Sequence, residues 1–133
     1  MKALKIEATR TTPEITLNPD GMLWIKGRSI HENVAEFYEP VDTWVNEYIE
    51  TPADLTRVDM NLEYFNSSSA KLFIQILQKI TYVSLKDKKF SFNWYFEEGD
   101  DDILERGEYF SSVLDVPFNF IPTKSAETPA TDK

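Results

Sequence analysis

The stretch that decides the fold is LEYFNSSSAKLFIQIL, residues Leu62–Leu77. Its beginning closes an alternating segment and its end has helical spacing, so it predicts a strand followed almost at once by a helix. Asn66 and the serines Ser67, Ser68 and Ser69 occupy the junction. Asn and Ser are the residue types whose side-chain oxygens best accept hydrogen bonds from the first turn of a helix. We therefore expect a capped helix to begin at this turn.

The same turn has a functional interpretation beside the capping one. A helix cap needs one side chain, whereas four small polar residues stand here in a row. A phosphate group placed there would add a charge of about −1.5 to −2 and three acceptor oxygens. The positive end of the helix would tolerate that charge, while an interface pressed against it would be disrupted. The turn thus indicates a regulatory phosphoprotein, with simple capping as the alternative.

Composition narrows the class of protein. The chain has 133 residues, of which 41% are hydrophobic and 14% aromatic, so we expect one domain with a substantial core. A net charge of −9 argues against general affinity for nucleic acid or anionic membranes. The absence of cysteine excludes disulfides, thiolate chemistry and Cys-ligated zinc. No signal peptide or apolar run of transmembrane length is present, which predicts a cytoplasmic protein.

Working outward from the central stretch, the predicted elements follow the order β-β-α-β-α-β-α-β. The predicted strands span residues 14–18, 22–27, 56–65, 90–96 and 117–121, and the predicted helices about 34–48, 68–84 and 100–114. Ser29 is the predicted cap of the first helix, with Glu32 at capping-box spacing, and Pro40 predicts a kink or broken turn within it. Residues 1–121 form the predicted domain. Residues 1–13 are expected to be partly loose, and 122–133 to be a disordered tail.

Strands that follow helices predict crossover connections and a mixed, mostly parallel sheet. The alternation of apolar and polar residues in 56–65 and 90–96 indicates a sheet with one covered face, so the helices should pack on one face only. Such an arrangement resembles the STAS fold of anti-sigma-factor antagonists. On this parity Val58, Met60, Leu62 and Tyr64 face the core. The aromatics Trp24, Phe65 and Tyr95 fall on the bare face, as a docking surface or packed against the N-terminal segment.

Enzyme signals are weak. The one histidine, His31, lies before the first helix without a G-x-S-x-G motif, and the isolated glycines form no phosphate-binding loop. The acidic run Glu97–Asp102 lacks the alternating ligands of a calcium loop. Its last three residues are better explained as acids at the positive start of a helix. We predict no catalytic residue, metal or cofactor. A small hydrolase or metal-binding enzyme joining His31 to carboxylates near Asp100 is the alternative of another class.

Several motifs together resemble the SiaC family of bacterial regulatory phosphoproteins over about residues 12–121. They are TPEI (12–15), GRSIHENVAEFYEPVDTWV (27–45), LEYFNSSSAK (62–71), WYFEEGDDD (94–102) and VPFNFI (116–121). The resemblance implies a STAS-like partner switch without enzymatic activity. The family's phosphoacceptor is the hydroxyl residue directly after the Asn of the serine turn, which corresponds to Ser67, with Ser68 and Ser69 as rivals. Partner contacts are then expected from Phe65, Asn66, Ser67 and Ser68.

The resemblance also implies partners. A dedicated SiaB-like protein kinase adds the phosphate, and a SiaA-like phosphatase of the PP2C type removes it. The unphosphorylated form binds and stimulates a SiaD-like diguanylate cyclase, which raises cyclic di-GMP and favours aggregation or biofilm growth. An anti-sigma-factor antagonist, with the same switch and another partner, is the alternative within signalling.

Overall fold

The computed structural model describes residues 1–124 of the chain, which form one six-stranded sheet in the order β1-β2-β3-β4-β5-β6. The first three strands are antiparallel, and β3 to β6 run parallel. The strands are β1 (Leu4–Ile6), β2 (Glu14–Leu17), β3 (Met22–Ser29), β4 (Leu55–Phe65), β5 (Lys89–Glu97) and β6 (Asn119–Thr123). The helices are α1 (Val34–Tyr48), α2 (Ser67–Thr81), the 3-10 helix η1 (Tyr82–Lys86) and α3 (Asp101–Leu114).

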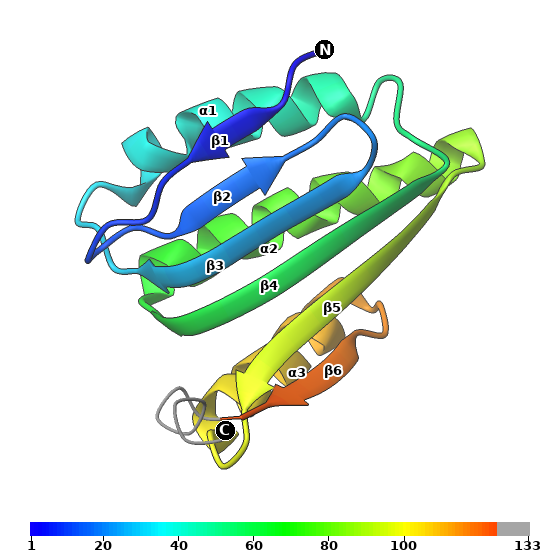
Figure 1. Ribbon diagram of the computed structural model, residues 1–133. Coiled ribbons are helices and arrows are strands. Elements are labelled where there is room, and N and C mark those ends of the chain that lie inside the picture. Colours follow the sequence, from blue (N-terminus) through cyan, green and yellow to red (C-terminus); the bar gives the residue numbers. More distant parts are fainter. Residues whose placement is uncertain (125–133) are drawn as a thin grey trace, which may run out of the picture.

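All three α-helices lie on the same face of the sheet. Figure 1 shows α1 and α2 behind the N-terminal strands and α3 behind β5 and β6, while the opposite face carries no helix. Each parallel pair is joined through one α-helix, and η1 follows α2 in the connection between β4 and β5. The predicted mixed α/β sheet with one covered face is therefore confirmed. No helix within residues 1–124 is both long enough and apolar enough to cross a membrane.

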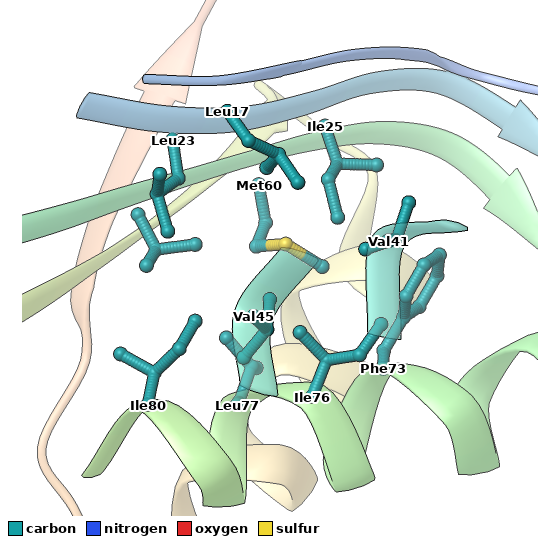
Figure 2. A pocket seen from close by; sticks show the side chains of 11 residues that line it. Leu17, Leu23, Ile25, Val41, Val45, Met60, Phe73, Ile76, Leu77 and Ile80 are labelled. Carbon is teal, nitrogen blue, oxygen red and sulfur yellow. The ribbon is translucent and has the colours of Figure 1, made fainter. Parts of the chain in front are cut away.

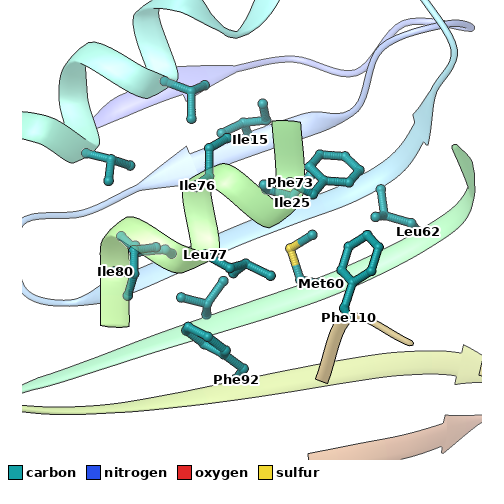
Figure 3. Packing of buried hydrophobic residues seen from close by; sticks show 14 of the residues in the cluster. Ile15, Ile25, Met60, Leu62, Phe73, Ile76, Leu77, Ile80, Phe92 and Phe110 are labelled. Atoms are coloured by element: carbon teal, nitrogen blue, oxygen red, sulfur yellow. The ribbon is translucent and has the colours of Figure 1, made fainter. Parts of the chain in front are cut away.

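The core fills the space between the sheet and α1 and α2. Figure 2 shows side chains from β2, β3, β4, α1 and α2 converging on an apolar gap of about 10 Å³. A gap of that size has room for about one water molecule, and its apolar lining offers that water no partner. Figure 3 shows how the core continues past Met60 to Phe92 and Phe110, so the second half of the sheet shares it.

The entry into α1 differs from the sequence prediction. Ser29 is the last residue of β3 and is buried, so it does not cap the helix. Asn33 is the cap: its Oδ1 accepts from the Glu36 backbone N–H at 3.3 Å, and its Nδ2 donates to the Glu36 carboxylate at 2.9 Å. The predicted broken turn at Pro40 is also wrong, because α1 is continuous there. Pro40 cannot donate to the carbonyl of Glu36, and both residues are exposed, on the side of the helix that water reaches.

The two ends of the chain also extend beyond the prediction. Residues 1–13, expected to be partly loose, contain β1, and the indole of Trp44 donates to the Lys2 carbonyl at 2.8 Å. At the other end, β6 reaches Thr123, two residues beyond the predicted strand and inside the predicted tail. The rest of that tail, 125–133, lies outside the described residues.

Candidate functional site

A bulge at the end of β4 sets up the serine turn. β3 and β4 pair in register as far as Gly27 opposite Leu62, but the next pair is Arg28 opposite Tyr64, which leaves Glu63 as an extra residue. An extra residue reverses the inside–outside alternation beyond it. The side chain of Tyr64 is consequently 49% exposed, whereas that of Phe65 is 0% exposed.

The predicted orientations of Tyr64 and Phe65 are therefore wrong. Phe65 lies in an aromatic cluster, with ring centroids 5.5 Å from Phe73, 6.0 Å from Trp94 and 5.7 Å from Phe110. Such ring pairs contribute beyond simple burial, and they explain why the chain turns Phe65 inward. Phe65 supports the turn from beneath and does not belong to an open docking face.

The turn itself is a well-formed helix start. Asn66 caps α2, because its Oδ1 accepts from the Ser69 backbone N–H at 2.9 Å. The Asn66 backbone N–H in turn donates to the carbonyl of Ser29 at 3.1 Å, which ties the turn to the end of β3. The next two residues, Ser67 and Ser68, are exposed. The sequence prediction of a capped helix beginning here is confirmed.

Ser69 differs from its neighbours because it is fully buried. Its Oγ donates to the Ser29 carbonyl at 2.8 Å and lies 2.7 Å from the Ser29 Oγ, which lies 2.8 Å from the Tyr38 hydroxyl. Each hydroxyl has one proton, so a single order satisfies all three: Tyr38 donates to Ser29, Ser29 to Ser69, and Ser69 to the carbonyl. Burial raises the pKa of the Tyr38 hydroxyl above its usual range, so it remains a donor. A kinase cannot reach Ser69 in this arrangement.

A surface cleft of about 250 Å³ opens beside Ser67, between the first turn of α2 and the face of α3 that runs from Asp102 to Phe110. Arg106 lies in it, donating from Nη1 to the Phe65 carbonyl, with its guanidinium carbon 4.3 Å from the centroid of the Phe65 ring. Tyr109, also in the cleft, is 62% exposed, and the centroid of the Tyr64 ring lies 5.5 Å from the guanidinium carbon of Arg106. The lining residues are Phe65, Ser67, Ala70, Asp102, Glu105, Arg106, Tyr109 and Phe110.

Sequence reasoning missed Tyr64, Arg106 and Tyr109. The bulge that turns Tyr64 outward has no signature in the sequence. Asp102, Arg106 and Tyr109 are spaced as one helical face, i, i+4 and i+7, which is the signal that was available. That face indicates a surface of α3, but only the fold places it beside Ser67.

The predicted aromatics on the helix-free face lie apart from the turn. Trp24 and Tyr95 face that side and are half-buried, as their parity predicts. Trp24 pairs with Asp59, six residues before Phe65 on β4, so it lies roughly 20 Å from the turn at 3.3 Å per residue. The Trp24 indole donates to the Glu14 carboxylate at 3.1 Å.

Polar side chains at the centre of the helix-free face satisfy one another. Asp59 accepts from Arg57 at 3.2 Å and from Asn93 at 2.8 Å, and Asn119 donates to Asn93 at 2.9 Å. Asp59 is the largest cause of the raised pKa of the Arg57 guanidinium. This face therefore forms an internally bonded surface distinct from the serine turn.

The groups considered for enzymatic chemistry have local structural partners. His31 Nδ1 accepts from the Asn33 backbone N–H at 2.9 Å, and Asp100 caps α3 by accepting from the Ile103 N–H at 3.1 Å. The cleft containing Asp100 is lined by Asn61, Leu62, Glu63, Phe96 and Glu97, without His31. Within residues 1–124, no three His, Cys, Asp or Glu side chains gather as a metal site would require.

Comparison with known proteins places this geometry in a family. Residues 6–123 match the SiaC family of regulatory phosphoproteins. The chain belongs to the SiaC family. This SiaC-family chain is 28% identical, over 119 residues, to an uncharacterized protein of Pseudomonas aeruginosa strain UCBPP-PA14; the match covers 89% of this chain and 94% of that protein.

Solved SiaC structures share its fold. Apo-SiaC of Pseudomonas aeruginosa superposes with a TM-score of 0.79 at 27% identity, covering 94% of this chain and all of that one (100%). SiaC from the crystal structure of the diguanylate cyclase SiaD in complex with its activator SiaC, also of Pseudomonas aeruginosa, superposes with a TM-score of 0.80 at 27% identity. That match covers 92% of this chain and 99% of the other.

Proposed function

We propose that this SiaC-family chain is a non-enzymatic, cytoplasmic switch protein that binds and stimulates a diguanylate cyclase until Ser67 is phosphorylated. A SiaB-like kinase transfers the γ-phosphoryl group of ATP to the Ser67 Oγ; the hydroxyl proton is released and ADP leaves. A PP2C-like phosphatase of the SiaA type hydrolyses the ester and restores binding. Cyclase stimulation raises cyclic di-GMP and favours aggregation or biofilm growth.

The observation that carries the proposal is the exposed Ser67 in a cleft that Arg106 and Tyr109 also line, with the Tyr64 ring 5.5 Å from the Arg106 guanidinium carbon. Tyr and Arg are the residue types, with Trp, that dominate binding energy at protein interfaces. Arg106 and Tyr109 line the same cleft as the exposed Ser67, and Tyr64 lies beside Arg106. The likeness to a SiaC found in complex with SiaD makes a cyclase the expected partner.

The switch follows from charge. Ser67 shares its cleft with the exposed carboxylates of Asp102 and Glu105. A phosphate on Ser67 adds about −1.5 to −2 charge to a surface that a partner must desolvate. Burying that charge without a partner is costly, so an interface over the cleft is lost while the fold persists.

Kinase treatment tests the acceptor. The protein is incubated with a SiaB-like kinase and ATP and digested with trypsin. The peptide 58–71, which contains all three serines of the turn, is then fragmented in a mass spectrometer. We expect phosphate on Ser67, and none on that peptide when Ser67→Ala protein is used. Phosphate on Ser68, or on no serine of this peptide, overturns the assignment.

Binding measurements test the surface. We expect Tyr109→Ala to weaken cyclase binding about tenfold or more, since a central interface tyrosine typically contributes 1.4 kcal/mol or more. Ser67→Asp should weaken it as well. Tyr82→Ala is the matched control, because Tyr82 is 47% exposed but stands at the opposite end of α2. Equal effects of Tyr109→Ala and Tyr82→Ala contradict the proposed surface.

The same material distinguishes the alternative partner. Ser67→Ala protein, locked in the unphosphorylated state, is used as bait in a lysate of the source organism. Recovery of a diguanylate cyclase, with a rise in its activity on adding the pure protein, supports the proposal. Recovery of an anti-sigma kinase in its place identifies the chain as an anti-sigma-factor antagonist.

A further inference from the structure

Arg106 is held in an unusual way for a half-buried arginine on a helix surface. It donates from Nη1 to the Phe65 carbonyl, the last backbone acceptor before the serine turn. Its guanidinium is packed on the Phe65 ring at 4.3 Å and lies near the Tyr64 ring at 5.5 Å. A hydrogen bond and two aromatic contacts fix the plane of the guanidinium, so little side-chain entropy remains to be lost when it binds an anion.

Most of the donors of that guanidinium remain available. Arginine has five N–H donors, and the carbonyl of Phe65 takes one. Among residues 1–124, the four ion pairs are Arg28–Glu63, Arg57–Asp59, Lys79–Asp42 and Lys88–Asp54, so Arg106 pairs with no carboxylate. Asp102, one turn earlier on α3, lines the same cleft without closing a bridge to it.

We infer that Arg106 is the intramolecular binding group for the phosphate on Ser67. The inference rests on the proposed function, since it concerns the phosphorylated state of the same site. Ser67 and Arg106 line one cleft from two helices. The planar guanidinium matches two phosphate oxygens, which is the geometry that makes arginine the preferred partner of phosphate groups.

The pairing explains more of the switch than added charge alone. In the unphosphorylated protein Arg106 faces the cleft beside Tyr109 and is available to a partner protein. Once Ser67 carries a phosphate, the remaining donors of Arg106 bind that phosphate, and the docking surface loses its free cation as it gains an anion. The pairing also distinguishes Ser67 from Ser68, because Ser68 does not line the cleft.

One rival cation must be separated from Arg106. Lys71 is exposed and stands four residues after Ser67 on α2, where side chains of the same helix face meet. The carboxylates of Asp102 and Glu105 act in the opposite direction, because they disfavour the doubly charged phosphate. The informative quantity is therefore the change caused by removing each cation, and not the absolute pKa of the phosphate.

The test uses full-length protein with phosphoserine incorporated at position 67 during synthesis, so no kinase is needed. The second pKa of the phosphate, about 6 for an unpaired phosphoserine, is measured by ³¹P NMR. We expect R106Q to raise this pKa by about half a unit or more relative to the parent protein. K71Q should change it by less. In protein carrying phosphoserine at position 68, R106Q should leave it unchanged.

Two outcomes overturn the inference: R106Q leaves the phosphate pKa within about 0.1 unit of the parent, or K71Q produces the whole shift. A measurement on the parent protein covers the case in which R106Q does not fold. In the parent protein, the NMR resonance of the Arg106 Nε–H must shift as the phosphate titrates, and a resonance that does not shift rejects the pairing. Failure of the kinase to modify Ser67 would overturn the proposed function but not this result, so the two failures are distinguishable.

Discussion

Replacing Ser69 with alanine tests the buried hydroxyl chain beneath the serine turn. The Ser69 Oγ donates to the Ser29 carbonyl at 2.8 Å and accepts from the Ser29 hydroxyl at 2.7 Å, and all three residues of the chain, with Tyr38, are buried. Ser69→Ala removes both bonds. The Ser29 carbonyl keeps its bond from the Asn66 N–H, but the Ser29 hydroxyl loses its acceptor.

The magnitude follows from that inventory. A buried donor left without a partner costs about 1–3 kcal/mol, whereas a carbonyl that retains one partner adds little. We expect Ser69→Ala to lower the free energy of unfolding by about 2 kcal/mol, with a fall in Tm of roughly 6–8 °C for a chain of this size. The effect should reach α1 as well, because Tyr38 is the first donor of the chain.

Urea denaturation followed by tryptophan fluorescence measures the change, with Ser68→Ala as the matched control. Ser68 is the adjacent residue on the same turn of α2 and is exposed, so its replacement should alter stability by less than about 0.5 kcal/mol. Tyr38→Phe should be non-additive with Ser69→Ala, because both break one chain. Equal stabilities of the Ser69→Ala and Ser68→Ala proteins would refute the proton order assigned here.

Three further predictions concern packing, capping and pH. Gly107→Ala should lower the free energy of unfolding by about 1–3 kcal/mol in urea denaturation, although alanine has the better helix propensity. The reason is that the new Cβ would lie 2.5 Å from Trp94, a buried side chain with little room to move. An unchanged free energy of unfolding would contradict this packing. Asn66→Ala removes the cap of α2 and should lower the free energy of unfolding by about 1 kcal/mol. An unchanged urea midpoint would contradict this role of Asn66. In an NMR titration the Asp54 carboxyl should show a pKa below its usual value, because Lys88 hydrogen-bonds and attracts it, and Lys88→Met should restore that value. A carboxyl whose pKa is lowered by folding contributes stability at pH values above its unfolded pKa, and that contribution is lost as the pH falls through its folded pKa. Because the Asp54 side chain is exposed, the contribution is small.

The sequence predicted the elements whose signals are local. The alternation in β4 as far as Leu62 and a capped helix at the serine turn depend on neighbouring residues alone, and the structure has both. The single covered face followed from the polar residues Arg57 and Asp59, which alternate with the apolar ones on β4. These features require no knowledge of what lies across the sheet.

The errors arose where a distant partner decides the local structure. Ser29 has the composition and spacing of a cap, but pairing with Phe65 continues β3 through it, and Asn33 becomes the cap. The outward orientation predicted for Phe65 failed because its aromatic neighbours come from α2, β5 and α3. Arg106 was overlooked for the same reason: its contacts are more than forty positions away in the sequence, at Phe65 and Tyr64.

The bulge at Glu63 connects these observations, because one extra residue decides what the serine turn can do. If Glu63 were paired in regular register, the strict alternation of β4 would point Tyr64 into the core and Phe65 toward the helix-free face. Arg106 would lose the ring on which it packs, and Tyr64 would leave the surface. The bulge therefore gives the turn a rigid aromatic base in Phe65 and two neighbours, the exposed Tyr64 and the half-buried Arg106. A one-residue deletion at Glu63 closes the bulge but leaves Leu62, Tyr64 and Phe65 opposite Gly27, Arg28 and Ser29, so Tyr64 stays outward and Phe65 stays inward. We therefore expect the deletion variant to keep partner binding, and a deletion variant that folds but no longer binds would show that the orientation of these two rings does not by itself make the docking surface.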